Sequence, residues 1–216
     1  MIAGGVVALA VTVFAARKFG GKKAKKIDAF VFSGPSGVGK GTMISRLLRE
    51  HRESLSLCVS HTTRAPRAGE IDGSHYHFVD QKDMLDMIGE NKFLEVCQVH
   101  DNIYGTSKAA LEHVTASGKT AIIEIDVKGA EKIKMEHPEL NVHFVFIQAP
   151  SMKDLEERIR GRDGSSAKVE LRLATAEFEM AFIKDHTSLY NTIITNDDLE
   201  RAYTEIETLM KSKGCF

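Results

Sequence analysis

A glycine-rich turn near the start of the chain constrains the fold more than any other feature of the sequence. Residues 33–42 read Ser-Gly-Pro-Ser-Gly-Val-Gly-Lys-Gly-Thr, directly after the apolar run 29–32. The glycines allow a tight backbone turn that brings several N–H groups close together. A helix beginning near Lys40 adds its positive dipole end at the same point. Strand, turn, lysine and helix in this order predict a loop that holds the phosphates of a nucleoside triphosphate.

One position departs from the usual form of this loop. A hydroxyl residue normally follows the lysine directly and lies beside Mg²⁺. Here Gly41 follows Lys40, and Thr42 comes one residue later. Thr42 is therefore the candidate metal residue, either directly or through water. A chance glycine-rich turn before a helix is the competing interpretation, and the flanking strand and helix argue against it.

Length and charge limit the remaining possibilities. The chain has 216 residues, enough for one domain with a full core and an inserted lobe. Its net charge is −1 and the first 26 residues carry +6, so the remainder carries −7. An acidic body argues against nucleic acid as a partner. The three cysteines are far apart and odd in number, which favours a reducing compartment over a disulfide framework.

The N-terminal segment 1–26 differs from the rest of the chain. Residues 2–16 are almost wholly apolar, and six basic residues follow without an acid. A secretory signal has its charge before the apolar stretch, whereas here the charge follows it. We expect either membrane contact through residues 2–19, with the domain facing the cytosol and tethered for example to the mitochondrial outer membrane, or an organelle-targeting peptide. A disordered extension is the third possibility.

From residue 27 onward, strands alternate with helices. We expect strands at 29–33, 55–59, 76–79, 93–99, 120–125, 142–147 and 190–195, and helices at 40–52, 81–91, 107–117, 128–137, 151–160, 168–186 and 199–213. Alternation of this kind predicts a mainly parallel sheet covered by helices on both faces. Residues 60–106 have short strands and many Gly, Arg, Tyr and His residues. We interpret this region as a small lobe inserted into a three-layer α/β domain.

Two arginines stand three residues apart in the loop 60–70. Proline and glycine prevent this loop from forming a helix, so Arg64 and Arg67 are not a solvated helix face. Two guanidinium groups that converge on one point suit a phosphate. Tyr76 and Tyr104 could each give a hydroxyl to the same anion. A surface loop with incidental arginines is the alternative.

Glu95 lies inside the apolar run 93–97. An acid in a short strand usually faces solvent by alternation. Its functional alternative is base recognition, because a carboxylate accepts two parallel hydrogen bonds and guanine offers N1–H and N2–H₂ in that arrangement. Adenine places an acceptor at N1, so a carboxylate would select against it.

Further charged residues flank the expected phosphate site. The buried strand 120–125 carries Glu124 and ends at Asp126, where an acid could lie near Mg²⁺ or cap the next helix. Arg158, Arg162 and Arg172 flank a Gly/Ser turn, and helical spacing places the first two on one face. A mobile arginine-bearing segment suits phosphoryl transfer, although ordinary surface ion pairs are the alternative.

Taken together, these stretches resemble the guanylate kinase family. The resemblance runs from about residue 29 to 210, with motifs in the family's order. The matching stretches are Ser-Gly-Pro-Ser-Gly-x-Gly-Lys, the 60–70 loop, Asp72-Gly73-x-x-Tyr76-x-Phe78, Phe93-Leu94-Glu95, Tyr104-Gly105-Thr106, Glu124-Ile125-Asp126-Val-Lys-Gly129 and Asn196-Asp197-Asp198. The family implies a P-loop fold over residues 27–213, with a GMP-binding lobe at 60–106 and an arginine lid at 158–172.

The resemblance also implies residue roles. The residues that cradle the ATP phosphates would be Gly34, Pro35, Ser36, Gly37, Val38, Gly39, Lys40, Gly41 and Thr42. The clamping arginines would be Arg158, Arg162 and Arg172, and Asn196 would lie near the adenine. The GMP phosphate would be held by Arg64, Arg67, Tyr76 and Tyr104. The guanine would be read by Ser60, Glu95, Thr106 and Asp126, with Glu124 near the metal waters.

The implied reaction is reversible transfer of the ATP γ-phosphoryl group to GMP and to dGMP, with Mg²⁺, by a monomer or weak dimer. Because the acceptor is already an ionised phosphate, alignment and charge neutralisation suffice. Two alternatives stay open at this point. One is a non-catalytic scaffold with the same fold, which would typically lack the loop lysine and lid arginines. The other is a P-loop kinase for another small phosphorylated acceptor.

Overall fold

The computed structural model describes residues 26–99, 101–163 and 167–216. The five-stranded sheet is parallel throughout, in the order β2-β7-β1-β8-β9. Its strands are β1 (Ala29–Ser33), β2 (Leu55–Leu57), β7 (Thr120–Glu124), β8 (Val142–Gln148) and β9 (Thr192–Thr195). The predicted parallel sheet is confirmed.

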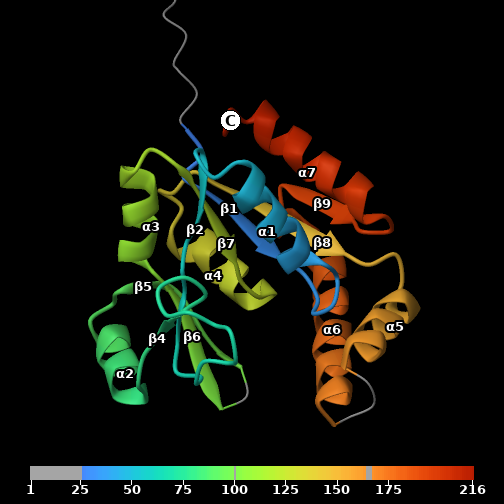
Figure 1. Cartoon of the computed structure of the whole chain (residues 1–216), viewed down its shortest axis with the longest axis horizontal. Coiled ribbons are helices and arrows are strands. Elements are labelled where there is room, and N and C mark those ends of the chain that lie inside the picture. Colours follow the sequence, from blue (N-terminus) through green and yellow to red (C-terminus); the bar gives the residue numbers. More distant parts are fainter. Residues whose placement is uncertain (1–25, 100, 164–166) are drawn as a thin grey trace, which may run out of the picture.

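Helices cover both faces of this sheet (Figure 1). They are α1 (Lys40–Glu50), α3 (Lys108–Ala116), α4 (Val127–Glu136), α5 (Met152–Asp163), α6 (Ala167–Asp185) and α7 (Leu199–Ser212), with a 3₁₀ turn at Thr187–Leu189. Alternate residues of β1 point to opposite faces. Phe30 and Phe32 pack on the α1 and α7 side, and Ala29 and Val31 on the α3 and α4 side. The expected three-layer α/β arrangement is therefore present.

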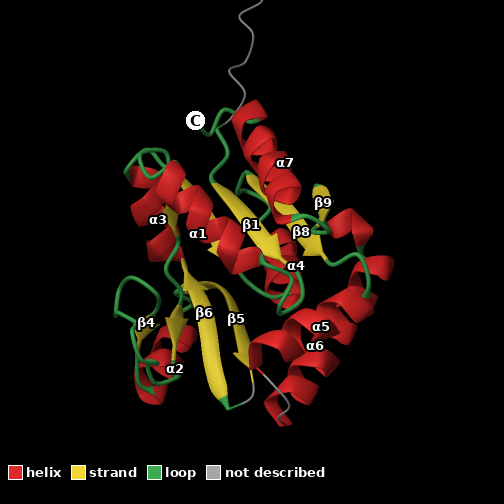
Figure 2. Ribbon diagram, turned by 45° about the vertical axis from the view of Figure 1, so that its right-hand side comes forward, coloured by secondary structure: helices red, strands yellow, loops and turns green. Residues whose placement is uncertain are grey.

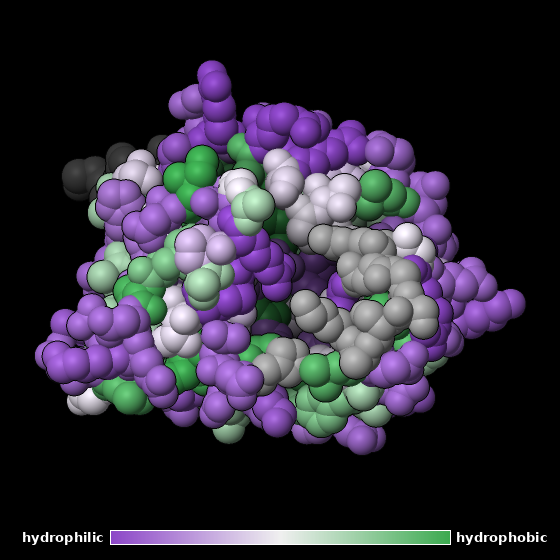
Figure 3. All heavy atoms as spheres, turned by 60° about the horizontal axis from the view of Figure 1, so that its bottom comes forward, coloured by the Kyte–Doolittle hydropathy of each residue, from purple (hydrophilic) through white to green (hydrophobic). Residues whose placement is uncertain are grey.

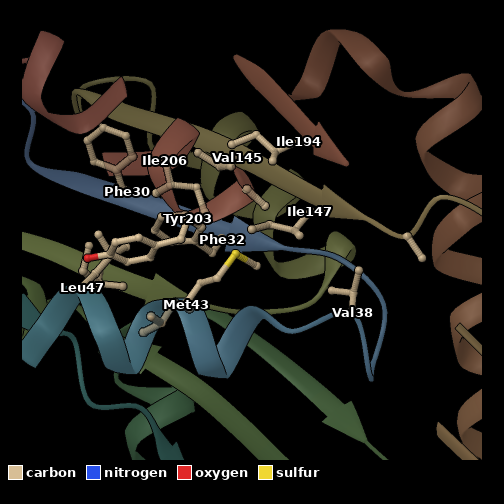
Figure 4. Packing of buried hydrophobic residues seen from close by; sticks show 14 of the residues in the cluster. Phe30, Phe32, Val38, Met43, Leu47, Val145, Ile147, Ile194, Tyr203 and Ile206 are labelled. Atoms are coloured by element: carbon tan, nitrogen blue, oxygen red, sulfur yellow. The ribbon is translucent and has the colours of Figure 1, made fainter. Parts of the chain in front are cut away.

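Figure 4 shows the first of these two cores in detail. Phe30 and Phe32 of β1 meet Met43 and Leu47 of α1, and Ile206 of α7 closes the cluster. All five are fully shielded from solvent. Burial of each such side chain contributes about 1.5–3 kcal/mol, so this core fixes the strand that leads into the phosphate loop.

A separate sheet forms the inserted lobe (Figure 2). Its order is β4-β3-β6-β5, in which only β3 and β4 are parallel. The elements are β3 (His61–Thr62), β4 (His77–Phe78), α2 (Gln81–Gly89), β5 (Phe93–Val99) and β6 (Asn102–Ser107). Strands β3 and β6 were not predicted, because their polar and glycine-containing residues lack the apolar pattern of a strand.

Element boundaries differ from the predictions at several ends. The second strand stops at Leu57 and not at residue 59, and the fourth includes only His77 and Phe78. Helix α5 continues to Asp163, beyond the predicted end at residue 160. The N-terminal segment 1–25 lies outside the described residues. Within the described part of the chain, no helix has the length and apolar character that a bilayer crossing requires.

Candidate functional site

The turn between β1 and α1 has a backbone that only glycine adopts easily. Gly34, Gly37 and Gly39 have φ values of 140°, 84° and 98°. A Cβ at Gly34 would lie 2.0 Å from the carbonyl oxygen of Ile147 on β8, which cannot move aside. The central sheet thus sets the shape of this loop. The loop places the N-terminus of α1 at the carboxyl end of the central strand β1.

Lys40 and Asn196 hold the loop from its two sides. The Lys40 ammonium group donates to the carbonyl oxygen of Pro35 at 3.2 Å and also to that of Gly34. The Asn196 amide, buried beneath the loop, donates to the carbonyl oxygen of Val38 at 2.7 Å. In the structure, Asn196 therefore supports the loop. Its contact with adenine stays a prediction.

Two of the three predicted arginines meet at the loop. Arg172 of α6 donates from Nε and Nη2 to the Ser36 hydroxyl at 3.1 and 2.8 Å. Arg158 of α5 donates to the carbonyl oxygen of Asn196 at 3.0 Å. The side chain of Arg162 lies outside the described part of the structure.

A cleft of about 530 Å³ opens over the loop. It is lined by Pro35, Ser36, Gly37, Gly39, Lys40, Gly41, Thr42, Ser45, Glu124, Arg158 and Arg172. Thr42 is exposed in the first turn of α1, and Glu124 is exposed at the end of β7. Oxygen ligands are those that Mg²⁺ prefers, so a hydroxyl and a carboxylate lining one cleft fit such an ion.

In the small lobe, Arg64 is held by an acid that the sequence analysis gave no role. Its guanidinium group forms a two-point ion pair with Glu70, with both N–O distances at 2.9 Å. The backbone N–H of Arg67 donates to the same carboxylate at 2.7 Å. These contacts lower the pKa of Glu70 to about 2. Arg64 also lies over the ring of Tyr76, while Arg67 is exposed in the same loop.

Glu95 is buried, although simple alternation would point it to solvent. The strand register shifts between Phe93 and Glu95, which turns the carboxylate inward. Its Oε1 accepts from the backbone N–H of Thr106 at 2.8 Å, and its Oε2 is buried without a hydrogen-bond partner. Burial raises the pKa of Glu95 to about 7. A buried carboxylate oxygen without a donor fits a ligand that supplies N–H groups.

The predicted base-reading residues gather around this carboxylate. Ser60 and Thr106 hydroxyls are 3.1 Å apart, and the rings of Tyr76 and Tyr104 meet edge to face at 5.8 Å. Asp126 accepts from the Gly129 N–H at 2.7 Å, so it does cap α4. It also lines the same cleft, so the capping and functional interpretations are compatible.

This second cleft measures about 430 Å³ and joins the first. Ser36, Lys40 and Glu124 line both. Figure 3 looks into the molecule from the lower side of Figure 1 and shows the surface hollowed between the small lobe and the α5–α6 side. The glycine-rich loop therefore lies where the two clefts meet.

Three further residues of the site were not singled out from the sequence. Glu70 orients Arg64, and a Cβ at Gly129 would lie 3.1 Å from Glu95 Oε2. Glu179 of α6 is buried and lines the second cleft. The sequence could have indicated Glu179, because it is an acid at a position where the helical pattern expects an apolar residue. Ala176 and Ile183 lie one turn away on either side, and both are buried.

A parallel α/β sheet whose first strand feeds a glycine-rich loop, a lysine and a helix N-terminus defines the class of P-loop nucleotide-binding proteins. Within that class, the guanylate kinase family model matches residues 26–213. The chain belongs to the guanylate kinase family.

Individual relatives agree with this assignment. The chain is 46% identical to guanylate kinase 1 of Arabidopsis thaliana over 85% of its own length, but spans only 47% of that relative. It is 39% identical to the guanylate kinase of Schizosaccharomyces pombe, covering 87% of this chain and 92% of the relative. The crystal structure of guanylate kinase from Anaplasma phagocytophilum superposes with a TM-score of 0.67 at 31% identity, covering 87% and 86%.

Proposed function

We propose that this chain transfers the γ-phosphoryl group of ATP to GMP, giving ADP and GDP, and that dGMP is also accepted. The observation that carries the proposal is the pair of joined clefts that share Lys40. One is lined by the phosphate loop and by arginines, and the other by a buried carboxylate with an unpartnered oxygen. Family membership supports both substrates.

The residues supply alignment and charge, without a covalent intermediate. The loop N–H groups and Lys40 hold the triphosphate, and Arg158 and Arg172 add charge at the same cleft. Arg64, Arg67, Tyr76 and Tyr104 hold the acceptor phosphate, while Glu95 accepts the guanine N–H groups. A GMP phosphate is largely ionised at neutral pH, so no general base is needed.

Mg²⁺ would be held at the first cleft by Thr42, directly or through water, with Glu124 near its water ligands. When bound, it would neutralise phosphate charge during the transfer. Asn196, Asp126, Ser60 and Thr106 complete the proposed substrate contacts. Arg162 is proposed as a third clamping arginine on the strength of the resemblance alone.

A coupled assay of ADP release with GMP, dGMP, AMP and UMP tests the proposal. We expect strong preference for GMP and dGMP. Equal or greater turnover with AMP would contradict the role of Glu95 in base reading. Absence of turnover with every acceptor would favour a non-catalytic scaffold. Turnover with a phosphorylated sugar, tested in the same assay, would favour a P-loop kinase for another small phosphorylated acceptor.

The location of the protein is a separate proposal. The apolar and basic character of residues 1–26 supports either a membrane tether, with the domain facing the cytosol, or an organelle-targeting peptide. Imaging fluorescent fusions with and without these residues distinguishes them. Diffuse signal from both fusions would rule out both roles.

A further inference from the structure

Helix α6 presents a stripe of polar side chains to the two joined clefts. Arg172, Thr175 and Glu179 are spaced by three and four residues, which places them on one side of the helix. Arg172 lines the first cleft, and Thr175 and Glu179 line the second. The helix that brings a cation to the phosphate loop therefore also brings an acid to the acceptor side.

Glu179 is unusual among these three because it is buried, with only 6% of its surface exposed. Its neighbours along the buried side of α6, Leu173, Ala176 and Ile183, are all apolar. An apolar residue would satisfy packing at position 179 at lower cost, since burial of a charged group is expensive. An acid at this position therefore has a use beyond packing.

Taken together, the surroundings of Glu179 disfavour its ionised carboxylate relative to the neutral acid. Burial raises the pKa of Glu179 to about 7, the positive charge of Lys40 lowers it, and the negative charge of Asp126 raises it further. Burial raises the pKa of Tyr190, which follows the 3₁₀ turn, and the charge of Glu179 adds to this increase. The other titratable groups lining this cleft are Cys58, His75, Tyr76, Glu95, Cys97, Tyr104 and Glu124.

We propose that Glu179 is a further positioning residue of the phosphoryl-transfer site, which balances the charge of Lys40 while the phosphates are absent and takes up a proton when they bind. The proposal rests on the proposed function, because it assumes that two phosphates meet beside Lys40. Their negative charge favours the neutral acid at position 179, and the proton comes from solvent. A neutral acid does not repel the phosphates and leaves the Lys40 charge to them.

The role predicts a specific pH dependence. Glu179 must be neutral in the loaded site, so kcat/KM for GMP falls as pH rises above about 7 and Glu179 of the free protein ionises. Glu95 acts in the opposite direction, because guanine needs its ionised form, and it therefore sets the acid side of the profile. Glutamine at position 179 mimics the neutral acid and cannot ionise.

The experiment compares Glu179→Gln, Glu179→Ala and the matched control Glu177→Gln from pH 5.5 to 9. Glu177 lies on the exposed side of the same helix. We expect Glu179→Gln to stay within about threefold of the wild-type protein at pH 7 and to lose the alkaline fall. Glu177→Gln should keep the wild-type profile, and Glu179→Ala should lose about tenfold in kcat/KM because the polar group is removed from the cleft that Lys40 also lines. If Glu179→Ala fails to fold, Glu179→Gln decides the matter.

Calorimetry gives a second readout that does not depend on turnover. Binding of a non-hydrolysable ATP analogue with GMP, measured in buffers of different ionisation enthalpy, counts the protons exchanged. At pH 7 we expect Glu179→Gln to take up about 0.5 fewer protons than the wild-type protein, because a group with a pKa near 7 is half ionised there.

Three results would overturn the proposal: an unchanged alkaline fall in Glu179→Gln, the same loss in Glu179→Gln as in Glu179→Ala, or an unchanged proton count. Failure of the proposed function is a different outcome, since the wild-type protein would then not phosphorylate GMP. The proton count with the ATP analogue alone would still test Glu179 in that case.

Discussion

The two sides of the candidate site are built in different ways. On the phosphate-loop side, the backbone is fixed by the parallel sheet, since Gly34 lies against β8 and Asn196 supports Val38 from below. On the lobe side, the candidate side chains are held by hydrogen bonds to other residues of the lobe. Glu70 holds Arg64, and the backbone N–H of Thr106 holds Glu95.

This difference has a physical consequence. The loop carries its binding groups on the main chain, so its geometry follows from the core and tolerates few changes at its glycines. The lobe binds through side chains whose charge and protonation depend on neighbours, so its affinity should respond to pH and to conservative substitutions. We expect catalytic power to depend on the first side and choice of acceptor on the second.

Replacement of Lys40 by alanine should have the largest effect. We expect kcat to fall by about 10³-fold, because one positioned donor to a developing charge is worth that order of magnitude. The hydrogen bonds of Lys40 lie within its own loop, so the melting temperature should stay near that of the wild-type protein. Steady-state kinetics and a thermal melt measure both. A comparable loss of GMP affinity would break the division between the two sides.

Glu95→Gln should reduce kcat/KM for GMP by about 10²-fold, with a smaller change in kcat. The backbone N–H of Thr106 keeps the amide oxygen, so the amide NH₂ turns toward the guanine donors. The exposed acid Glu90, also in the lobe, provides the matched control Glu90→Gln. If Glu95→Gln discriminated between GMP and AMP as well as the wild-type protein does, Glu95 would not read the base.

The acid side of the pH profile should belong to Glu95. Its pKa of about 7 lies above the ordinary value of 4.5, so folding favours the neutral acid while guanine binding needs the carboxylate. GMP affinity should therefore fall as pH drops below 7, by up to about tenfold per unit. The contribution of Glu95 to unfolding free energy has the opposite sign, being full below pH 4.5 and lost as pH rises through 7. Titration calorimetry measures the GMP affinity and denaturant unfolding measures the free energy of unfolding, each for the wild-type protein and for Glu95→Gln.

The phosphate-loop side could be predicted from the sequence, whereas the lobe could be predicted only in part. The loop motif and the apolar strands identify the sheet and the position of Lys40, because local backbone rules dictate both. The burial of Glu95 depends on a register shift in β5, and its pairing with β6 joins residues that no periodicity connects. The same holds for Glu179, which comes to line the same cleft as Lys40 only in the folded domain. Strand alternation alone predicted a solvent-facing Glu95, and the family resemblance favoured the alternative of base recognition.

Loss of the Arg64 partner should have a smaller effect. In Glu70→Gln, we expect KM for GMP to rise about fivefold, because Arg64 is less well held. Discrimination between GMP and AMP should not change, since the ion pair does not include Glu95, the proposed base-reading carboxylate. Glu53→Gln removes an exposed partner of Arg52 and is the control. Changed base preference in Glu70→Gln would show that the lobe acts as one unit.

Gly41→Ser should have the smallest effect and separates the glycines of the loop by their function. A Cβ at Gly41 meets nothing within 4 Å, and the residue is exposed in the first turn of α1. Serine there should stabilise the helix by about 0.5 kcal/mol and change turnover by no more than about twofold. Gly34→Ala, with its Cβ against a β8 carbonyl, should by contrast abolish the loop geometry.

The Mg²⁺ dependence of Gly41→Ser completes this test. If the Thr42 hydroxyl already holds the ion or its water, a hydroxyl one residue earlier adds little, and the Mg²⁺ concentration for half-maximal activity should stay the same. Thr42→Ala should then raise that concentration, and Ser45→Ala, which alters another hydroxyl of the same cleft, should not. A large fall in the Mg²⁺ requirement of Gly41→Ser would mean that Thr42 is not the metal residue. In that case only phosphate and water oxygens would bind the ion in the wild-type protein.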